Sequence, residues 1–298
     1  MYKNIFNIKL KELTPMPVEI EPVLKRLKGI KALLFDIYGT LLISGSGDIS
    51  ISSGGTAEAD IKFILEKSGF ILNQQKNDLL ITEGLVKKSI NRHIKETHRE
   101  LINNGICCPE VEIREIWEKV IADLKKNRII KDTRETADTE KAALMYELSV
   151  NPVWPMPGFP EITDRLENSG FILGIVSNAQ FYTKIIIEEL TGRSLDNLGF
   201  REDFCEWSYR IKKAKPSPEI FKKPLENLEK KGIKPENILY IGNDMLNDVS
   251  TAASCGCRTA LFAGDKRSLR LREEDNRVKV RPDIIITDLM SIQQCLEL

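Results

Sequence analysis

The sequence of 298 residues lacks any apolar stretch near the roughly 18 residues that a membrane-spanning helix needs. It also lacks net charge, because 44 basic and 44 acidic side chains cancel, so the whole molecule has no field that would attract nucleic acid or an anionic membrane. None of its six cysteines has the CxxC spacing of a structural zinc site, and we expect free thiols. With no recognisable signal peptide, we expect a soluble protein of a reducing cytoplasm, with no nucleic-acid or membrane partner.

Asp36 stands at the end of the first short apolar run, Ala32–Phe35, and Gly39 and Thr40 then break the pattern. Such a run predicts a fully buried strand. The carboxyl end of a central parallel strand is where open α/β sheets bind ligands. Because an Asp at a strand end can also cap the next turn, Asp36 alone leaves both interpretations open.

Three further segments place polar side chains in similar positions. The apolar run Phe171–Val176 is followed by Ser177 and Asn178, and Lys215 stands in a Lys-Pro-Ser-Pro sequence just before a predicted helix. The run Ile238–Ile241 is followed by Gly242 and by a cluster of amides and carboxylates: Asn243, Asp244 and Asp248. A nucleophile, a hydroxyl, a cation and an acidic group therefore follow one another along the chain.

In this order, from about residue 31 to 262, the segments resemble the four motifs of the haloacid dehalogenase (HAD) superfamily. The resemblance implies an α/β fold with a Rossmann-like parallel sheet core and an inserted α-helical cap domain. It also implies that Asp36 attacks the substrate and becomes a transient aspartyl-phosphate. Thr40, Ser177 and Asn178 would bind the phosphoryl group, and Lys215 would neutralise charge on both nucleophile and substrate.

We expect a core domain of residues 1–43 plus 157–298 and a helical cap of residues 44–156. From 56 to 148 the sequence shows helical periodicity and no strand-like runs, and 77–104 could form one helix or two. The resemblance implies a lid that closes over the active site, and a bundle that only stabilises the core is the alternative.

The predicted cap is bounded by two linkers. The Gly- and Ser-rich stretch 44–55 indicates a hinge, and the closely spaced prolines of 151–158 indicate a return linker rather than a helix or central strand.

In the rest of the core, predicted helices alternate with predicted strands, and this alternation predicts a parallel sheet. Helices are expected over 20–27, 160–169, 181–191, 218–231, 248–255 and 288–295, and strands over 171–176, 204–207, 238–241, 258–262 and 284–286.

The resemblance implies a Mg²⁺ ion held by Asp36, the backbone carbonyl of Tyr38 and the acidic fourth motif. Here the sequence departs from the family, because the usual Gly-Asp pair is replaced by Gly242-Asn243, with the acid displaced to Asp244 and a second acid at Asp248. A neutral Asn243 removes one charge, so we expect weaker metal binding unless Asp244 replaces it. Asp248 could alternatively cap the helix that follows.

Tyr38 is the second departure. Phosphatases of the family have at this position an Asp that protonates the leaving group, whereas Tyr resembles the metal-independent 2-haloacid dehalogenases. Without that Asp, a phosphatase should prefer good leaving groups such as acyl phosphates, or else receive its proton from the cap, where His93 and His98 are the only histidines.

Two observations oppose the dehalogenase alternative. Phe221 stands where those enzymes carry a Tyr, and an acidic cluster without a metal would repel a haloacid. The leading hypothesis is a Mg²⁺-dependent hydrolase of a small phosphorylated compound, with Asp244 and Asp248 as acidic metal partners. The alternatives are a dehalogenase that uses Asp36 without metal, and a non-catalytic phosphate-binding or protein-interaction module in which Tyr38 and Asn243 mark a decayed site. The sequence predicts no oligomeric state.

Overall fold

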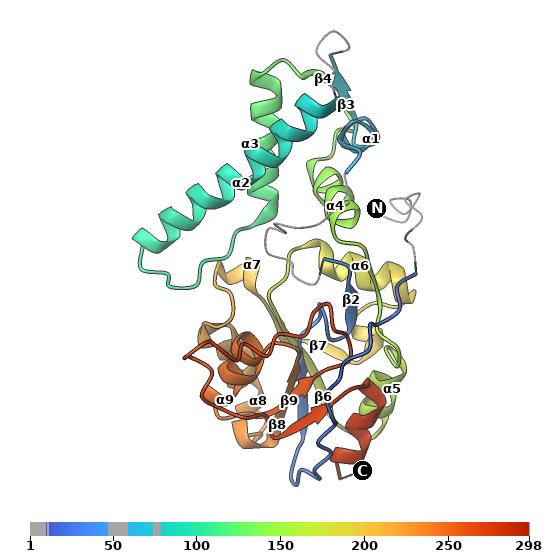
Figure 1. Cartoon of the computed structure of the whole chain (residues 1–298), viewed down its shortest axis with the longest axis vertical. Helices are drawn as coiled ribbons and strands as arrows, with labels where there is room; N and C mark the ends of the chain where they lie inside the picture. The colour runs from blue at the N-terminus through green and yellow to red at the C-terminus, as the bar shows by residue number, and fades with distance from the viewer. Residues whose placement is uncertain (1–9, 11, 47–58, 74–78, 298) are drawn as a thin grey trace. The chain divides into compact units, whose positions relative to one another are not determined.

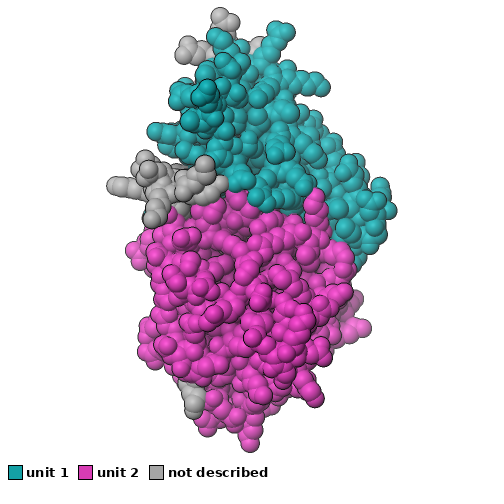
Figure 2. Space-filling view, turned by 180° about the vertical axis from the view of Figure 1, so that it is seen from behind, with its two compact units in different colours: residues 1–11, 50–152 teal, residues 12–49, 153–298 magenta. Residues whose placement is uncertain are grey.

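The computed structural model describes residues 10, 12–46, 59–73 and 79–297. The chain divides into two compact units: Met1–Lys11 with Ser50–Pro152, the helical unit, and Glu12–Ile49 with Val153–Leu298, the sheet unit (Figure 2). Most of the predicted hinge lies outside the described residues. That the helical unit acts as a lid stays a prediction.

The described part of the sheet unit is built on a six-stranded sheet with the order β10-β9-β8-β1-β6-β7, and every neighbouring pair is parallel. The strands are β1 (Ala32–Phe35), β6 (Ile172–Ser177), β7 (Phe200–Trp207), β8 (Ile238–Gly242), β9 (Arg258–Phe262) and β10 (Ile284–Ile286). β1 and β8 are buried along their whole length, as expected for strands covered on both faces. The predicted α/β core with a parallel, Rossmann-like sheet is confirmed.

Helices lie on both sides of the sheet, with α8 and α9 on one side and α5 on the other (Figure 1). Their bounds are α5 (Glu161–Asn168), α6 (Tyr182–Thr191), α7 (Ser208–Ile211), α8 (Lys222–Glu229) and α9 (Thr251–Ser254). Short 3-10 helices precede α8 and end the chain: η4 (Pro218–Phe221) and η7 (Leu289–Cys295). The predicted helix near 248–255 starts earlier, as a π-helical segment, η6 (Met245–Ser250), that leads into α9.

The predicted helix over 20–27 is wrong. Val23 instead forms an antiparallel bridge with Ile285 of β10, through hydrogen bonds of 2.8 and 3.1 Å between their backbones. The N–H of Leu27 donates to the carbonyl of Cys295 at 2.8 Å. β10 is an edge strand, and its outer backbone N–H and C=O groups need hydrogen-bond partners. Pairing with them outweighs the weak helical pattern of residues 20–27.

The helical unit contains α1 (Ile61–Lys67), α2 (Leu79–Asn103), α3 (Ile113–Lys126) and α4 (Thr139–Val150). Residues 77–104 therefore contain one long helix in their described part. The expectation that this region lacks strands is wrong, because β3 (Phe70–Leu72) and β4 (Ile130–Thr133) pair antiparallel. Among the described residues, no helix is both long enough and apolar enough to cross a membrane.

The sheet unit also contains a short antiparallel ladder at the two points where the chain leaves for the helical unit and returns. β2 (Leu42–Ser44) pairs with β5 (Val153–Pro155), with Ser44 opposite Val153. β5 lies within the predicted proline-rich linker, and Pro155 is tolerated because this ladder is not part of the central sheet.

Candidate active site

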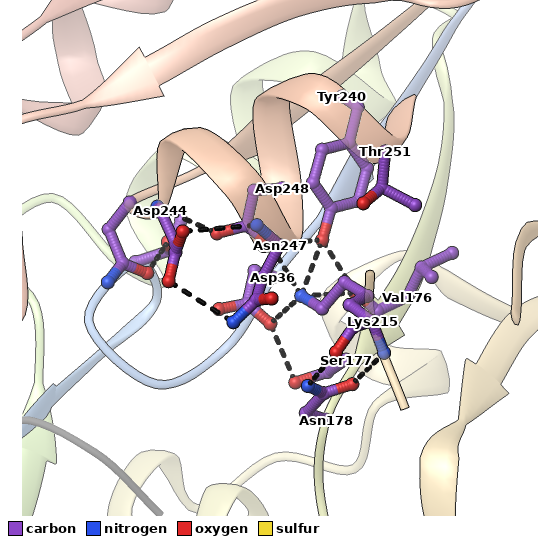
Figure 3. Close-up of polar contacts among 12 residues, drawn as sticks. Asp36, Val176, Ser177, Asn178, Lys215, Tyr240, Asp244, Asn247, Asp248 and Thr251 are labelled. Atoms are coloured by element: carbon purple, nitrogen blue, oxygen red, sulfur yellow. Dashed lines mark hydrogen bonds and ion pairs between the residues drawn. The ribbon is translucent and has the colours of Figure 1, made fainter. Parts of the chain in front are cut away.

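The predicted site residues gather at the carboxyl edge of the central sheet. Figure 3 shows Asp36, Ser177, Asn178, Lys215, Asp244 and Asp248 among them. β1 lies between β6 and β8, with Phe35 opposite both Ile175 and Ile241. Because parallel strands end at the same edge, the residues that follow β1 meet those at the ends of β6 and β8. The sheet register therefore brings Asp36 and Ser177 together.

Asp36 is 7% exposed and its two carboxylate oxygens differ in their surroundings. Oδ1 accepts hydrogen bonds from Ser177 Oγ at 2.8 Å and from Lys215 Nζ at 2.7 Å. Oδ2 accepts no hydrogen bond from the residues that the structure describes. One oxygen is thus anchored, and the other is available to a substrate or a cation.

Lys215 connects the nucleophile position to the acidic cluster, and its side chain is 2% exposed. Nζ lies 2.7 Å from Asp36 Oδ1, 2.6 Å from Asp248 Oδ1 and 2.9 Å from the hydroxyl of Tyr240 (Figure 3). Burial alone would lower the pKa of Lys215, but the carboxylates of Asp248 and Asp36 outweigh it and raise that pKa above its ordinary value. The side chain therefore remains an ammonium.

Asn178 fixes the backbone of Lys215. Asn178 Oδ1 accepts from the Lys215 N–H at 2.7 Å, and its Nδ2 donates to the Lys215 carbonyl at 3.2 Å. The structure thus places Asn178 at the site and gives its amide the task of positioning Lys215. Its predicted contact with the phosphoryl group stays a prediction.

Asp248 is 1% exposed, and both of its oxygens accept hydrogen bonds. Oδ1 accepts from Lys215 and, at 3.0 Å, from the hydroxyl of Tyr240, and Oδ2 accepts from the N–H of Asp244 at 2.9 Å. Burial raises the pKa of Asp248 to about 7, with Lys215 opposing and Asp36 adding to the shift. Gly242 makes room for this side chain, because a Cβ there would lie 2.3 Å from Asp248 Cγ.

Asp244 caps the start of η6 and also forms an ion pair. Its Oδ1 accepts from the N–H groups of Leu246 and Asn247 at 2.8 and 3.0 Å. Its Oδ2 lies 2.7 Å from Nη2 of Arg272. A cation that used Asp244 would therefore compete with a guanidinium.

Asn243 and Thr40 bind each other rather than standing free in the site. Thr40 Oγ1 donates to Asn243 Oδ1 at 3.2 Å, and Asn243 Nδ2 donates to the carbonyl of Ser268 at 2.6 Å. Gly39 has φ +85°, and a Cβ there would lie 2.6 Å from Ser268 Cβ. These contacts join the loops that follow β1, β8 and β9.

Tyr38 is buried, and its hydroxyl is hydrogen-bonded to Oγ1 of Thr183 on α6 at 2.9 Å. Thr183 is fully buried. The side chain that occupies the predicted proton-donor position is thus held by a partner that the sequence did not indicate.

A small cleft of about 70 Å³ connects these groups. It is lined by Asp36, Tyr38, Asn178, Lys215, Asn243, Asp244, Asn247, Asp248, Ser268 and Arg270. Sequence reasoning missed Tyr240, Thr183, Ser268, Arg270 and Arg272 at or around this cleft. Of these, only Tyr240 carried a signal, since its hydroxyl interrupts an otherwise apolar strand.

The oxygen donors of the cleft fit a hard cation of the Mg²⁺ type. Among the described residues, no three His, Cys, Asp or Glu side chains are grouped as a complete metal site. Mg²⁺ usually binds through one or two carboxylates and keeps several waters, so a full cage of protein ligands is not needed. The carboxylates of Asp36 and Asp248, both buried at the cleft, meet that smaller requirement.

Both histidines lie on α2 in the helical unit, where their surroundings differ. His93 Nε2 lies 2.8 Å from Asp123 Oδ2 on α3. His98 Nε2 is buried with no hydrogen-bond partner among the described residues, and burial lowers the pKa of His98. A proton-donor role for either histidine stays a prediction.

Comparisons with known proteins agree with this geometry. The sequence profile of the haloacid dehalogenase-like hydrolases matches residues 30–256. The rhythmically expressed gene 2 protein of Drosophila melanogaster is 28% identical over 160 residues, which cover 51% of this chain and 58% of that protein. The chain thus spans little more than half the length of this relative.

A second relative is aligned over more of its length. The phospholysine phosphohistidine inorganic pyrophosphate phosphatase of Mus musculus is 26% identical over 250 residues, covering 78% of this chain and 83% of that protein. Among solved structures, the 2-haloacid dehalogenase of Pseudomonas syringae pv. Tomato DC3000 superposes with a TM-score of 0.55 at 17% identity. That match covers 89% of this chain and 97% of the dehalogenase, and it shows the fold alone.

Proposed function

This chain belongs to the haloacid dehalogenase-like hydrolases, and we propose that within this family it is a Mg²⁺-dependent phosphatase of small phosphorylated compounds. The observation that carries the proposal is the asymmetry of Asp36. Ser177 and Lys215 hold Oδ1, and Oδ2 is left without a partner among the described residues. This is how a carboxylate nucleophile needs to be held, because one fixed oxygen orients the other for in-line attack.

Transfer would proceed in two steps. In the first, Asp36 Oδ2 attacks the phosphorus, the bond to the leaving group breaks, and an aspartyl-phosphate forms. In the second, water attacks that phosphorus, the bond to Asp36 breaks, and inorganic phosphate leaves. The ammonium of Lys215 and the hydroxyl of Ser177 stabilise the charge that accumulates on the phosphoryl oxygens in both steps.

Asp36, Asp248 and the backbone carbonyl of Tyr38 would hold the Mg²⁺ ion. Asp244 would join them if its ion pair with Arg272 is broken. When bound, the ion supplies positive charge to the transferring phosphoryl group. Asp248 is suited to this task because its buried carboxylate shares the single ammonium of Lys215 with Asp36. The name of the mouse relative gives phospholysine, phosphohistidine and inorganic pyrophosphate as what that phosphatase acts on, which supports a phosphorylated substrate.

A dehalogenase that uses the same nucleophile is the second candidate, and Tyr38 is the observation that favours it. The three buried carboxylates of the cleft argue against a dehalogenase, because the negative charge of a haloacid would be repelled by Asp36, Asp244 and Asp248. Lys215 and Arg272 are already engaged by these groups. The balance of charge at the cleft therefore favours a substrate that arrives with a divalent cation.

One set of assays separates the candidates. We expect the full chain to release phosphate from acetyl phosphate and p-nitrophenyl phosphate in the presence of Mg²⁺, and to lose this activity with EDTA or in Asp36→Asn. Halide release from 2-chloropropionate without metal would identify a dehalogenase. Inactivity on all three substrates, with a folded protein by circular dichroism, would identify a binding module. Asp203→Asn, at an Asp on β7 outside the cleft, is the matched control.

A further inference from the structure

The chemistry of phosphoryl transfer makes a demand on the cleft that depends on the leaving group. When the P–O bond breaks, the electron pair stays on the departing oxygen. An alkoxide needs a proton in the transition state, and a positioned acid typically contributes about 10²–10⁴-fold to the rate. A carboxylate is already a stable anion and leaves without one. The proton donors of the cleft therefore decide which substrates it can turn over.

Tyr38 is the neutral hydroxyl nearest to Asp36 in the sequence, and the fold commits that hydroxyl elsewhere. It is hydrogen-bonded to Thr183 Oγ1 at 2.9 Å, and both side chains are buried. A Tyr38 side chain that moved away to protonate a substrate would leave the buried Thr183 hydroxyl without this partner. Tyrosine is also a weak acid near neutral pH, with an ordinary pKa near 10.

The remaining groups that line the described cleft are no better suited. Lys215 directs its ammonium protons to Asp36, Asp248 and Tyr240. The guanidinium of Arg270 does not give up a proton, and the amides are not acids. Both oxygens of Asp248 already accept hydrogen bonds within the buried network. Asp244 accepts from backbone N–H groups and from Arg272, and the Ser268 hydroxyl donates to the carbonyl of Asp265. None of the side chains that line the described cleft therefore has a proton placed for an alkoxide.

We propose that the preferred substrates are acyl phosphates, in which a carboxylate leaves from phosphorus, and that alkyl phosphate monoesters are poor substrates. The inference rests on the proposed phosphatase function. Asp36 Oδ2 bonds to phosphorus, the bond from phosphorus to the acyl oxygen breaks, and the electron pair leaves with the carboxylate. No proton is transferred in this step.

Hydrolysis of the aspartyl-phosphate, the second step, also needs no acid. The group that departs from phosphorus there is the carboxylate of Asp36, so no protonation is required. Water attacks without an assigned base, gives its proton to phosphate or solvent, and restores Asp36. We therefore expect hydrolysis of the aspartyl-phosphate to be slower than its formation from an acyl phosphate, which produces a burst of carboxylate release equal to the enzyme concentration.

The test is a leaving-group series with the wild-type full chain and Mg²⁺. Initial rates are measured for acetyl phosphate, for aryl phosphates of graded phenol pKa, and for glycerol phosphate. We expect kcat/KM to fall steadily as the leaving group becomes more basic, with glycerol phosphate about 10²-fold or more below acetyl phosphate. A kcat/KM that is independent of the leaving group overturns the proposal, since it requires an acid from elsewhere in the chain.

A pair of variants tests the role of position 38 directly. Tyr38→Asp and Tyr38→Asn have side chains of equal size, and only the first offers a transferable proton. We expect the ratio of glycerol phosphate to acetyl phosphate turnover to be at least about tenfold higher in Tyr38→Asp than in Tyr38→Asn. Equal ratios in two folded variants would count against the proposal.

The assays also separate the substrate class from the phosphatase function. Phosphate release that Asp36→Asn abolishes, combined with equal use of alkyl and acyl phosphates, refutes the substrate class and leaves the phosphatase function intact. No release from acetyl phosphate or any ester refutes both. If the variants at 38 fail to fold, the wild-type series decides by itself.

Discussion

Lys215 Nζ lies 2.6 Å from Asp248 Oδ1 in a part of the site where both side chains are almost completely buried. The same ammonium lies 2.7 Å from Asp36 Oδ1, so one cation compensates two carboxylates. A buried charge without its partner is costly, because neither water nor counterions can replace the lost interaction. The stability of the site and its chemistry therefore depend on the same atom.

Replacing this cation should affect both properties. In Lys215→Met, Asp36 and Asp248 face each other uncompensated, and we expect the free energy of unfolding to fall by about 3–5 kcal/mol. Phosphatase activity should be lost. Urea denaturation checks the first expectation. Lys213→Met is the matched control: its ion pair with Glu219 is partly exposed, so its removal should cost under about 1 kcal/mol. Equal losses in the two variants would contradict the central role of Lys215.

Gly242 should tolerate no side chain. In Gly242→Ala the new Cβ would lie 2.3 Å from Asp248 Cγ, and the displaced carboxylate would lose its contacts. We expect a destabilisation of about 1–3 kcal/mol and a large loss of activity. Gly84→Ala, in α2, should instead stabilise the protein by about 0.5–1 kcal/mol, because among the described residues no atom outside the helix's own backbone and the chain neighbours lies within 4 Å of the added Cβ. Thermal unfolding of both variants measures the contrast, and a neutral Gly242→Ala would show that the cluster can rearrange.

Arg272 should weaken metal binding by competing for Asp244. Its Nη2 lies 2.7 Å from Asp244 Oδ2, so Arg272→Gln removes a positive charge and releases a carboxylate. We expect Mg²⁺ to bind about tenfold more tightly, which corresponds to about 1.4 kcal/mol. Isothermal titration calorimetry checks this, with Arg277→Gln as the control because its partner, Asp275, lies outside the cleft. An unchanged affinity would remove Asp244 from the ligand set.

His98 should make the protein sensitive to mild acid. Burial lowers the pKa of His98 below its ordinary 6.5, so the unfolded chain takes up a proton before the folded chain does. Its stabilising contribution is complete above that ordinary pKa and is lost as the pH falls. We expect the unfolding temperature to decrease between about pH 7.5 and 5.5, and to decrease less in His98→Leu. An equal pH dependence of the unfolding temperature in the wild type and in His98→Leu would show that His98 is not responsible.

The sequence predicted the central sheet well because its signal is local. Fully buried parallel strands are apolar throughout, and β1, β6, β8 and β9 each appear as a short run with a clear end. The polar residues directly after these ends, Asp36 and Asn243 among them, then meet because parallel register brings strand ends to one edge. The predicted cluster thus follows from the fold.

What the sequence could not predict depends on contacts between distant segments. Thr183 and Arg272 reach the site from a helix and a loop whose local patterns give no functional signal. The strands β3 and β4 are short, and their pairing across the helical unit outweighs the surrounding helical periodicity. The segment containing Val23 was misassigned for a similar reason, because its conformation is set by the unpaired edge of β10.

The ladder between β2 and β5 has a consequence for how this protein could be re-engineered. Neighbouring strands lie about 5 Å apart, so the chain re-enters the sheet unit almost where it departed. A tight turn could therefore bridge Ser44 and Val153 in a shortened gene, and another insert could be grafted at the same junction. The arrangement would allow the helical unit to be exchanged while Asp36 and its partners in the sheet unit stay in place.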